Sequence, residues 1–401
     1  MLKLVTIAIF AKLVFGASCE EALPGAVSDI KQMPVAWRPL ANSKLSVGLS
    51  QAPWSAQETL DAERAVERGL DEMRDFLNGH RRRILRLNDN AVEAVLDVAY
   101  GASAQPALQK RAFSEATSLL EICAQPWMKR SLRNIRPTDF GTLVTLAIYA
   151  HQLMPAESAI TAGLVARCNR SLQVAGSLPQ ATGFDVRTLS LSTPIGVDRA
   201  FDLNMWCVEL IGAQTVPGLN SQPEMREFLR VVWPYLAAYP LPNARDYSNG
   251  ANDPTFYGAA YLATHVAYIP TGYGRHALFI GDAPALYRYL RENFYYVLEI
   301  GELDLLAEFV DLLRQLGCTE ENDLQVRGGT RYLMRLYHEA GDSWLAIRDK
   351  TELRGVSEYN LLHKPWTGIA GVRRRVFEET GAGTYGAIFR AVFPAPRCGT
   401  Q

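Results

Sequence analysis

Helical periodicity recurs along nearly the whole chain, while strand-like alternation is scarce. Beyond residue 54, apolar residues repeat at helical spacing in twelve segments. The predicted helices are one that begins at the capping box of Ser55 and Glu58, followed by about 89–100, 106–124, 138–153, 156–173, 199–213, 222–239, 254–268, 283–299, 302–316, 325–340 and 357–377. The best strand candidate is Val186 to Leu191. The sequence therefore predicts an all-α fold with little or no β-sheet.

Short connections join many of these helices, so consecutive helices are expected to be antiparallel neighbours. The 401 residues, of which 48% are hydrophobic, can bury a large core as one large domain or two ordinary ones. Twelve helices in about six hairpins are what a closed ring of paired helices needs. An open helical solenoid gives a similar count, but the sequence has no repeat of fixed period.

In this arrangement of helices, residues 55–390 resemble the α/α-toroid (six-hairpin) superfamily, which includes glycosidases, polysaccharide lyases and cyclases. The resemblance implies an (α/α)6 toroid-like ring as a single helical domain over 55–390, with a tail at 391–401. Two long irregular stretches, 174–198 and 240–253, interrupt the helices. Irregular connections of this length in a compact domain are typical of binding loops or lids.

The N-terminus, MLKLVTIAIFAKLVFGASC, combines one early lysine, an apolar run broken by Lys12, and small residues before Cys19. This pattern is typical of a secretory signal peptide over residues 1–18, and the run is too interrupted for a membrane span. We therefore expect a secreted or periplasmic protein with no transmembrane segment after cleavage and an extended lead-in over 19–54. A lipid anchor at Cys19 is the alternative.

Charge and cysteine spacing exclude several classes of function. The formal net charge is -1 and basic runs are short, so nucleic acid is not an expected partner. The cysteines match no CxxC or zinc template. Buried thiols with one or two disulfide bridges are favoured over a metal site for Cys123, Cys168, Cys207, Cys318 and Cys398. A GxSxG motif and a P-loop are also missing, which argues against a nucleophilic triad and a nucleotide site.

The stretch 249–276 gathers more proton-transfer and anion-binding side chains than any other. Asp253 is the expected N-cap and Pro254 the first residue of a helix. Four ring side chains then recur at spacings of four, four and three, and so share one helical face: Tyr257, Tyr261, His265 and Tyr268. A glycine-rich loop follows with Tyr273, Arg275 and His276. We expect the ring-bearing face to point into an open hollow.

Removing a proton from the carbon next to a carboxylate needs a group that neutralises the carboxylate, a base that takes the proton and a donor that protonates the leaving oxygen. The residue types of this stretch suit these three tasks. Toroid lyases use Asn or His, Tyr and Arg for these tasks, so the expected function is an exported polysaccharide or oligosaccharide lyase that acts by β-elimination. The resemblance implies that His265 and Asn252 stabilise the intermediate, Tyr273 transfers the proton and Arg275 pairs with the carboxylate of a carbohydrate substrate. Further expected substrate contacts are Tyr257, Tyr261, His276, His363 and Trp366.

Other functions stay open. A glycosidase needs two carboxylates, and the acids in loops and caps form no recognisable pair: Asp185, Asp198, Asp202, Asp246, Asp253 and Asp342. A tailoring enzyme acting on a small molecule could use His265, His338 and His363, either without a cofactor or with a divalent metal held by His338, Asp342 and His363. Without that metal, no cofactor is expected. The last alternative is an exported binding or scaffold protein without catalysis.

Overall fold

The structure, a computed structural model, describes residues 24–40, 52–133, 136–272, 276–348, 357–374 and 392. This part of the chain is helical, contains no β-strand, and confirms the predicted all-α class. Its fourteen α-helices are α3 (Ala56–Asn78), α4 (Arg81–Leu87), α5 (Asp89–Gly101), α6 (Pro106–Lys129), α7 (Pro137–Leu153), α8 (Ala159–Ala175), α9 (Leu178–Thr182), α10 (Val197–Ala213), α11 (Pro223–Ala237), α12 (Pro254–Thr271), α13 (Pro284–Ile300), α14 (Leu303–Gln315), α15 (Leu324–Glu339) and α16 (Glu358–Val372). The short 3-10 helices are η1 (Val35–Trp37), η2 (Val186–Thr188), η3 (Ala244–Asp246), η4 (Gly250–Asn252) and η5 (Ile280–Asp282).

Most helices begin and end close to their predicted bounds. At the start of α3 the backbone N–H of Ser55 donates to Glu58 Oε2 at 2.9 Å, which completes the predicted capping box. Asp253 caps α12 by accepting a hydrogen bond from the Thr255 N–H at 2.9 Å. The helices α4 and α9 are additional to the twelve predicted, because segments of 7 and 5 residues are too short to show a helical period. The strand candidate at Val186 begins η2 instead.

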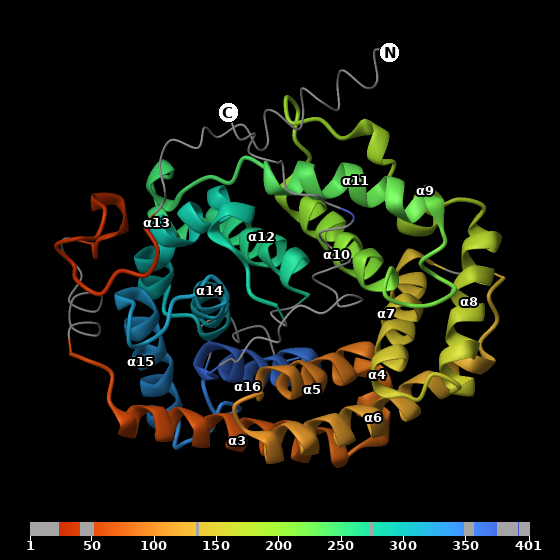
Figure 1. Ribbon diagram of the computed structural model, residues 1–401, viewed down its shortest axis with the longest axis horizontal. Helices are drawn as coiled ribbons and strands as arrows, with labels where there is room; N and C mark the ends of the chain where they lie inside the picture. The colour runs from red at the N-terminus through yellow and green to blue at the C-terminus, as the bar shows by residue number, and fades with distance from the viewer. Residues whose placement is uncertain are drawn as a thin grey trace, which may run out of the picture.

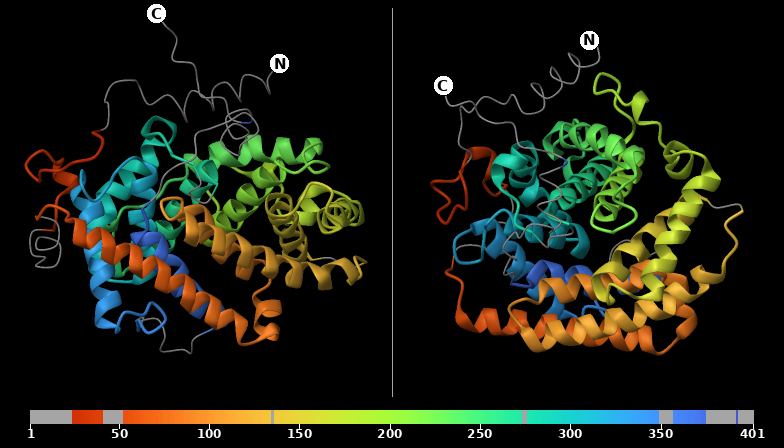
Figure 2. Two further views of the ribbon diagram at one scale, coloured as in Figure 1. Left: turned by 60° about the horizontal axis from the view of Figure 1, so that its bottom comes forward. Right: turned by 45° about the vertical axis from the view of Figure 1, so that its right-hand side comes forward.

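Six helices contact one another in a closed cycle. In order these are α5, α7, α10, α12, α14 and α16, and α16 returns to contact α5. The helices α6, α8, α11, α13, α15 and α3 lie outside this cycle, and each packs against one or more of the inner helices (Figures 1 and 2). The inner helices therefore direct side chains toward a common centre. Membership of the α/α-toroid superfamily stays an expectation.

Close approach of α16 to its neighbours depends on small residues. A Cβ atom on Gly368 would lie 2.4 Å from Trp344 Cε3, and one on Gly371 would lie 2.8 Å from the Cβ of Ala307 on α14. Beyond the end of α16, Arg373 donates to Asp97 Oδ2 of α5 at 2.8 Å. These contacts join the last inner helix to the first.

The part of the lead-in at 24–40 packs against the helical body rather than projecting from it. The Val27 N–H donates to Asp323 Oδ2 at 2.9 Å, and the Leu324 N–H donates to the Val27 carbonyl at 2.9 Å. Met33 and Trp37 are buried. The Asp323 carboxylate in turn forms an ion pair with the fully buried Arg291 at 2.8 Å.

Four of the cysteines are buried free thiols: Cys123, Cys168, Cys207 and Cys318. Cys19 and Cys398 lie outside the described residues, as do the predicted signal peptide over 1–18 and nearly all of the tail at 391–401. Within the described part of the chain, no helix has both the length and the apolar character needed to cross a bilayer.

Candidate functional site

The ring-bearing face of α12 lines a cavity between three inner helices. Tyr257, Tyr261 and His265 of α12 face Asp304 of α14 and His363 of α16 across a space of about 380 Å³. We call this space the His265 cavity. The i, i+4 spacing places the three α12 side chains in one row. The hydroxyl of Tyr257 donates to Glu302, and that of Tyr261 donates to Asp304.

Asp304 is held through one of its two carboxylate oxygens. Oδ2 accepts the Tyr261 hydroxyl and lies 3.4 Å from Nδ1 of His363, whereas Oδ1 has no hydrogen-bond partner. Burial acts to raise the pKa of Asp304, but the charge and hydrogen bond of His363, together with Tyr261, hold that pKa below its ordinary value. Burial likewise disfavours the charged form of His363, yet Asp304 keeps the pKa of His363 raised. Asp304 is therefore an oriented, ionised carboxylate whose second oxygen, Oδ1, is buried and accepts no hydrogen bond.

Glu308 lies one helical turn further along α14, and its carboxyl group is protonated whereas that of Asp304 is ionised. Burial, followed by the charge of Asp304, raises the pKa of Glu308 well above its ordinary value. The Thr264 hydroxyl lies 2.5 Å from Glu308 Oε2, and Nδ1 of His265 lies 3.7 Å from the same oxygen. Burial lowers the pKa of His265 to about 4, so this imidazole is neutral near pH 7. Glu308 is therefore a protonated acid beside a neutral histidine.

A smaller space of about 80 Å³ adjoins the His265 cavity. We call it the Glu308 pocket. It shares His265, Tyr359 and His363 with the His265 cavity. Arg373 lies in its lining and pairs with Asp97 at 2.8 Å and with Asp311 at 3.6 Å.

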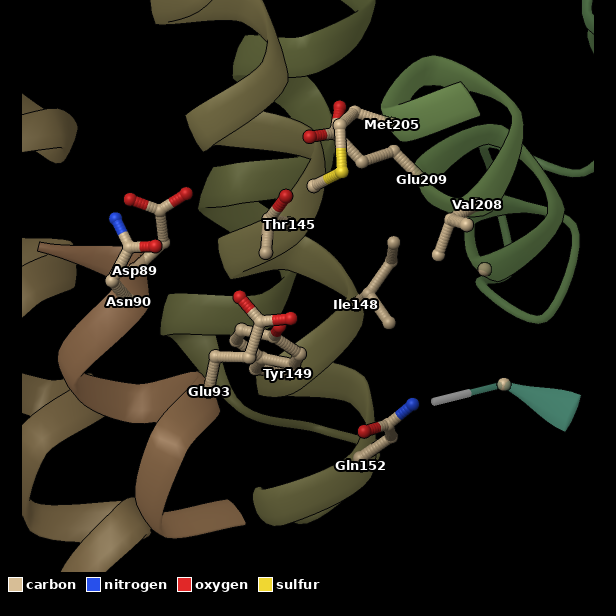
Figure 3. Close-up of a pocket in the computed structure, with 12 residues that line it drawn as sticks. Asp89, Asn90, Glu93, Thr145, Ile148, Tyr149, Gln152, Met205, Val208 and Glu209 are labelled. Carbon is tan, nitrogen blue, oxygen red and sulfur yellow. The ribbon is translucent and has the colours of Figure 1, made fainter. Parts of the chain in front are cut away.

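A third space of about 100 Å³ adjoins the Glu308 pocket. We call it the Glu209 pocket. Glu93 and Met205 line both spaces, so the Glu209 pocket and the Glu308 pocket are neighbours. Figure 3 shows the carboxyl groups of Asp89 and Glu93 on α5 and of Glu209 on α10 around Thr145 of α7.

An aromatic surface borders the larger cavity. Tyr359 is 41% exposed and stacks on His363 with a ring-centroid distance of 5.0 Å and an interplanar angle of 26°. Trp366 lines the Glu308 pocket. Its indole N–H donates to Asp97 Oδ2 at 3.0 Å, so this N–H is already occupied by a protein acceptor. An exposed phenol ring beside polar groups is suited to packing against the apolar face of a sugar.

Asn252 and His276, two further residues of the predicted site, do not line this cavity. Asn252 is exposed just before α12, and His276 is buried just beyond the opposite end of that helix. An 18-residue helix is about 27 Å long, so these two residues do not meet in one site. Tyr273 and Arg275, to which the sequence assigned proton transfer and carboxylate binding, lie outside the described residues.

The phenols of α12 are poor bases in this setting. Burial and the neighbouring carboxylates raise the pKa values of Tyr257 and Tyr261 above that of free tyrosine. Both hydroxyls donate hydrogen bonds to acids, which stabilises the neutral phenol. These hydrogen bonds orient the carboxylates of Glu302 and Asp304.

The proposed metal ligands do not form a cluster. His338 Nδ1 lies 2.6 Å from Asp342 Oδ1 at the exposed end of α15, while His363 pairs with Asp304 inside the His265 cavity. In the part of the chain that the structure describes, no group of three or more His, Cys, Asp or Glu side chains is placed to hold a metal ion.

Sequence reasoning missed the acids on the inner helices, because it considered only acids in loops and caps. Asp304, Glu308 and Asp311 recur at spacings of four and three within a helix that is otherwise rich in leucine. When acids recur at helical spacing on a helix that is otherwise apolar, they can indicate that the helix faces a polar cavity inside the protein.

No protein-family model, no curated protein and no solved structure matches this chain.

Proposed function

We propose that this protein hydrolyses glycosidic bonds in a carbohydrate, with Glu308 as general acid and Asp304 as general base. The observation that carries the proposal is the pair of carboxyl groups one helical turn apart, of which one is held ionised and the other protonated. Glycosidases divide the roles of base and acid between two carboxyl groups in this way. The signal-peptide pattern of residues 1–18 supports an exported enzyme.

The reaction balances with Asp304, which lines the His265 cavity, and Glu308, which lines the adjoining Glu308 pocket. Glu308 gives its proton to the glycosidic oxygen as the bond from that oxygen to the anomeric carbon breaks. Asp304 Oδ1, which has no hydrogen-bond partner, takes a proton from water as the water oxygen bonds to the anomeric carbon. The two carboxyl groups then return to their starting states by exchanging protons with solvent.

The side chains around the two acids have positioning roles. Tyr261 and His363 hold Asp304 Oδ2, and Thr264 holds Glu308. Tyr359 offers a surface for the sugar ring. The β-elimination route predicted from the sequence depends on Tyr273 and Arg275, and it stays a prediction. The raised pKa values of Tyr257 and Tyr261 favour hydrolysis over elimination by these phenols.

The test is a screen of the purified protein against neutral, amino-sugar and uronate oligosaccharides, measured by release of reducing ends. Asp304→Asn and Glu308→Gln keep the size of each side chain and are each expected to lower kcat by about 10²- to 10⁴-fold. Glu121→Gln alters an exposed acid on α6 and should leave kcat unchanged.

Full activity of Asp304→Asn and Glu308→Gln would contradict the proposed roles. An unsaturated product, detected by its ultraviolet absorbance, would show elimination instead of hydrolysis. If the wild-type protein cleaves none of the oligosaccharides, the proposal of a glycosidase fails.

A further inference from the structure

His265 has one ring nitrogen that bonds to its own helix and one that does not. Nδ1 lies 3.0 Å from the backbone oxygen of Tyr261, one turn earlier in α12. A carbonyl oxygen can only accept a hydrogen bond, so the proton of the neutral ring is assigned to Nδ1. Nε2 then carries a lone pair and no proton, and it can accept a hydrogen bond but not donate one.

The surroundings of the ring keep it neutral and leave Nε2 without a protein donor. Burial lowers the pKa of His265 to about 4, and the Tyr261 carbonyl and the charge of Asp304 oppose that shift only in part. Within the described part of the chain, the polar contacts of the ring are made by Nδ1, to Tyr261, to Thr264 at 3.1 Å and to Glu308 at 3.7 Å. The acceptor at Nε2 is therefore left for a ligand.

His265 lies where the two spaces near the proposed acids meet. It lines both the His265 cavity and the Glu308 pocket, and its side chain is 15% exposed. Because Nδ1 faces its own helix, the opposite edge of the ring, which carries Nε2, faces away from α12. Glu308 is the proposed proton donor and lies beside the same ring. A ligand atom bonded to Nε2 is therefore close to the bond that receives the Glu308 proton.

The neighbouring polar atoms of this wall also have no proton to offer. The Tyr257 hydroxyl donates to Glu302, and the Tyr261 hydroxyl donates to Asp304. A hydroxyl group has one proton, so both phenol oxygens can only accept further hydrogen bonds. Asp304 Oδ1 is likewise an acceptor without a donor. A ligand on this wall must supply the protons itself, and the hydroxyl groups of a sugar do so.

We propose that Nε2 of His265 accepts a hydrogen bond from a hydroxyl group of the sugar ring at the cleaved bond, so that the substrate must carry a free hydroxyl there. A sugar in which this hydroxyl is absent, methylated or acylated brings no proton to Nε2. His265 is then a substrate-binding residue, while Asp304 and Glu308 keep the roles of base and acid. This inference rests on the proposed function, because it names the group by which the same site recognises its substrate.

The experiment measures binding by calorimetry with sulfur-linked disaccharides of glucose, galactose and mannose, which resist hydrolysis. The disaccharide that binds most tightly is then compared with its monodeoxy analogues. The wild-type protein is expected to bind at least one monodeoxy analogue about 3- to 10-fold more weakly than the parent, which is the loss of one neutral hydrogen bond.

Three variants assign that loss to His265. His265→Asn keeps a donor for the Tyr261 carbonyl but does not extend to the position of Nε2, so it should bind the parent and the deoxy analogue equally. His265→Gln carries an amide oxygen to about that position and should restore part of the preference. His80→Asn changes an exposed histidine just before α4 and is the matched control, which should keep the wild-type preference.

Equal binding of the parent and all monodeoxy analogues by the wild-type protein would overturn the proposal, and so would failure to bind any of the three disaccharides. Cleavage of a glycan that depends on Asp304 and Glu308, with an unchanged deoxy preference in His265→Asn, would end this inference and leave the proposed glycosidase standing. A preference that disappears in His265→Asn, in a protein that cleaves no oligosaccharide, would support the hydroxyl contact and end the proposed hydrolysis.

Discussion

Asp304 and Glu308 lie on the same face of α14 and differ in protonation because their partners differ. Asp304 has the His363 imidazole and the Tyr261 hydroxyl as neighbours, and these favour its charged form. Burial raises the pKa of Glu308 and the negative charge of Asp304 adds to that rise, while the Thr264 hydroxyl opposes it only in part, so the neutral form of Glu308 is favoured. At this scale the chemistry is decided by the neighbours of each acid rather than by the acid itself.

The stability of the protein should respond to pH through Glu209. The unfolded chain loses the Glu209 proton near pH 4.5, whereas the folded chain keeps it up to about pH 8. Between these values the folded state binds more protons, so this residue lowers the free energy of unfolding as pH rises. Gln cannot ionise, so Glu209→Gln should be more stable than wild type at about pH 9 by on the order of 2 kcal/mol, with little difference at about pH 5.

Urea unfolding of both proteins at these two pH values measures the effect. Glu121→Gln, an exposed change of the same kind, should follow the wild-type pH dependence. Parallel stability curves for Glu209→Gln and wild type would contradict the assigned protonation.

At the scale of elements, one buried arginine on α13 attaches the lead-in to the helical body. Arg291 donates to Asp323 Oδ1 and to Gln325 Oε1, both at 2.9 Å. Asp323 accepts from the Val27 N–H, and Gln325 donates to the Trp37 carbonyl at 3.2 Å. The same pair of side chains therefore fixes α13, the start of α15 and the segment 24–40.

Arg291→Met is expected to lower the free energy of unfolding by about 3–5 kcal/mol, because it leaves the buried Asp323 carboxylate without its cation. It should also release the segment 24–40, which limited proteolysis would detect. Arg288→Met changes an exposed arginine on the same helix and serves as the control. Equal stability of the two variants would show that the ion pair does not hold the lead-in.

At the scale of the whole molecule, closure of the inner cycle depends on α16. This helix contacts α14, α3 and α5 and carries Tyr359 and His363 into the His265 cavity. Its glycines permit an approach that a larger residue would prevent, as at Gly368 against Trp344. The helix that closes the cycle against α5 therefore also supplies one wall of the His265 cavity.

Gly368→Ala places a methyl group 2.4 Å from Trp344 Cε3 and should cost about 1–3 kcal/mol of stability through overpacking. A lower melting temperature by calorimetry is the expected result, together with weaker substrate binding because α16 shifts. Gly281→Ala introduces a methyl group with nothing within 4 Å and should change neither. A Gly368→Ala protein that melts at the wild-type temperature would contradict the proposed tight closure.

The sequence by itself determined the helical class, the start of α3 at its capping box, the cap of α12 at Asp253, and which rings share a face of α12. Each depends on residues within a few turns of one another, where spacing alone decides the geometry. Only the tertiary structure decided that this face meets Asp304, Glu308 and His363. Those acids take their protonation from helices distant in the sequence, and periodicity within one helix carries no information about such partners.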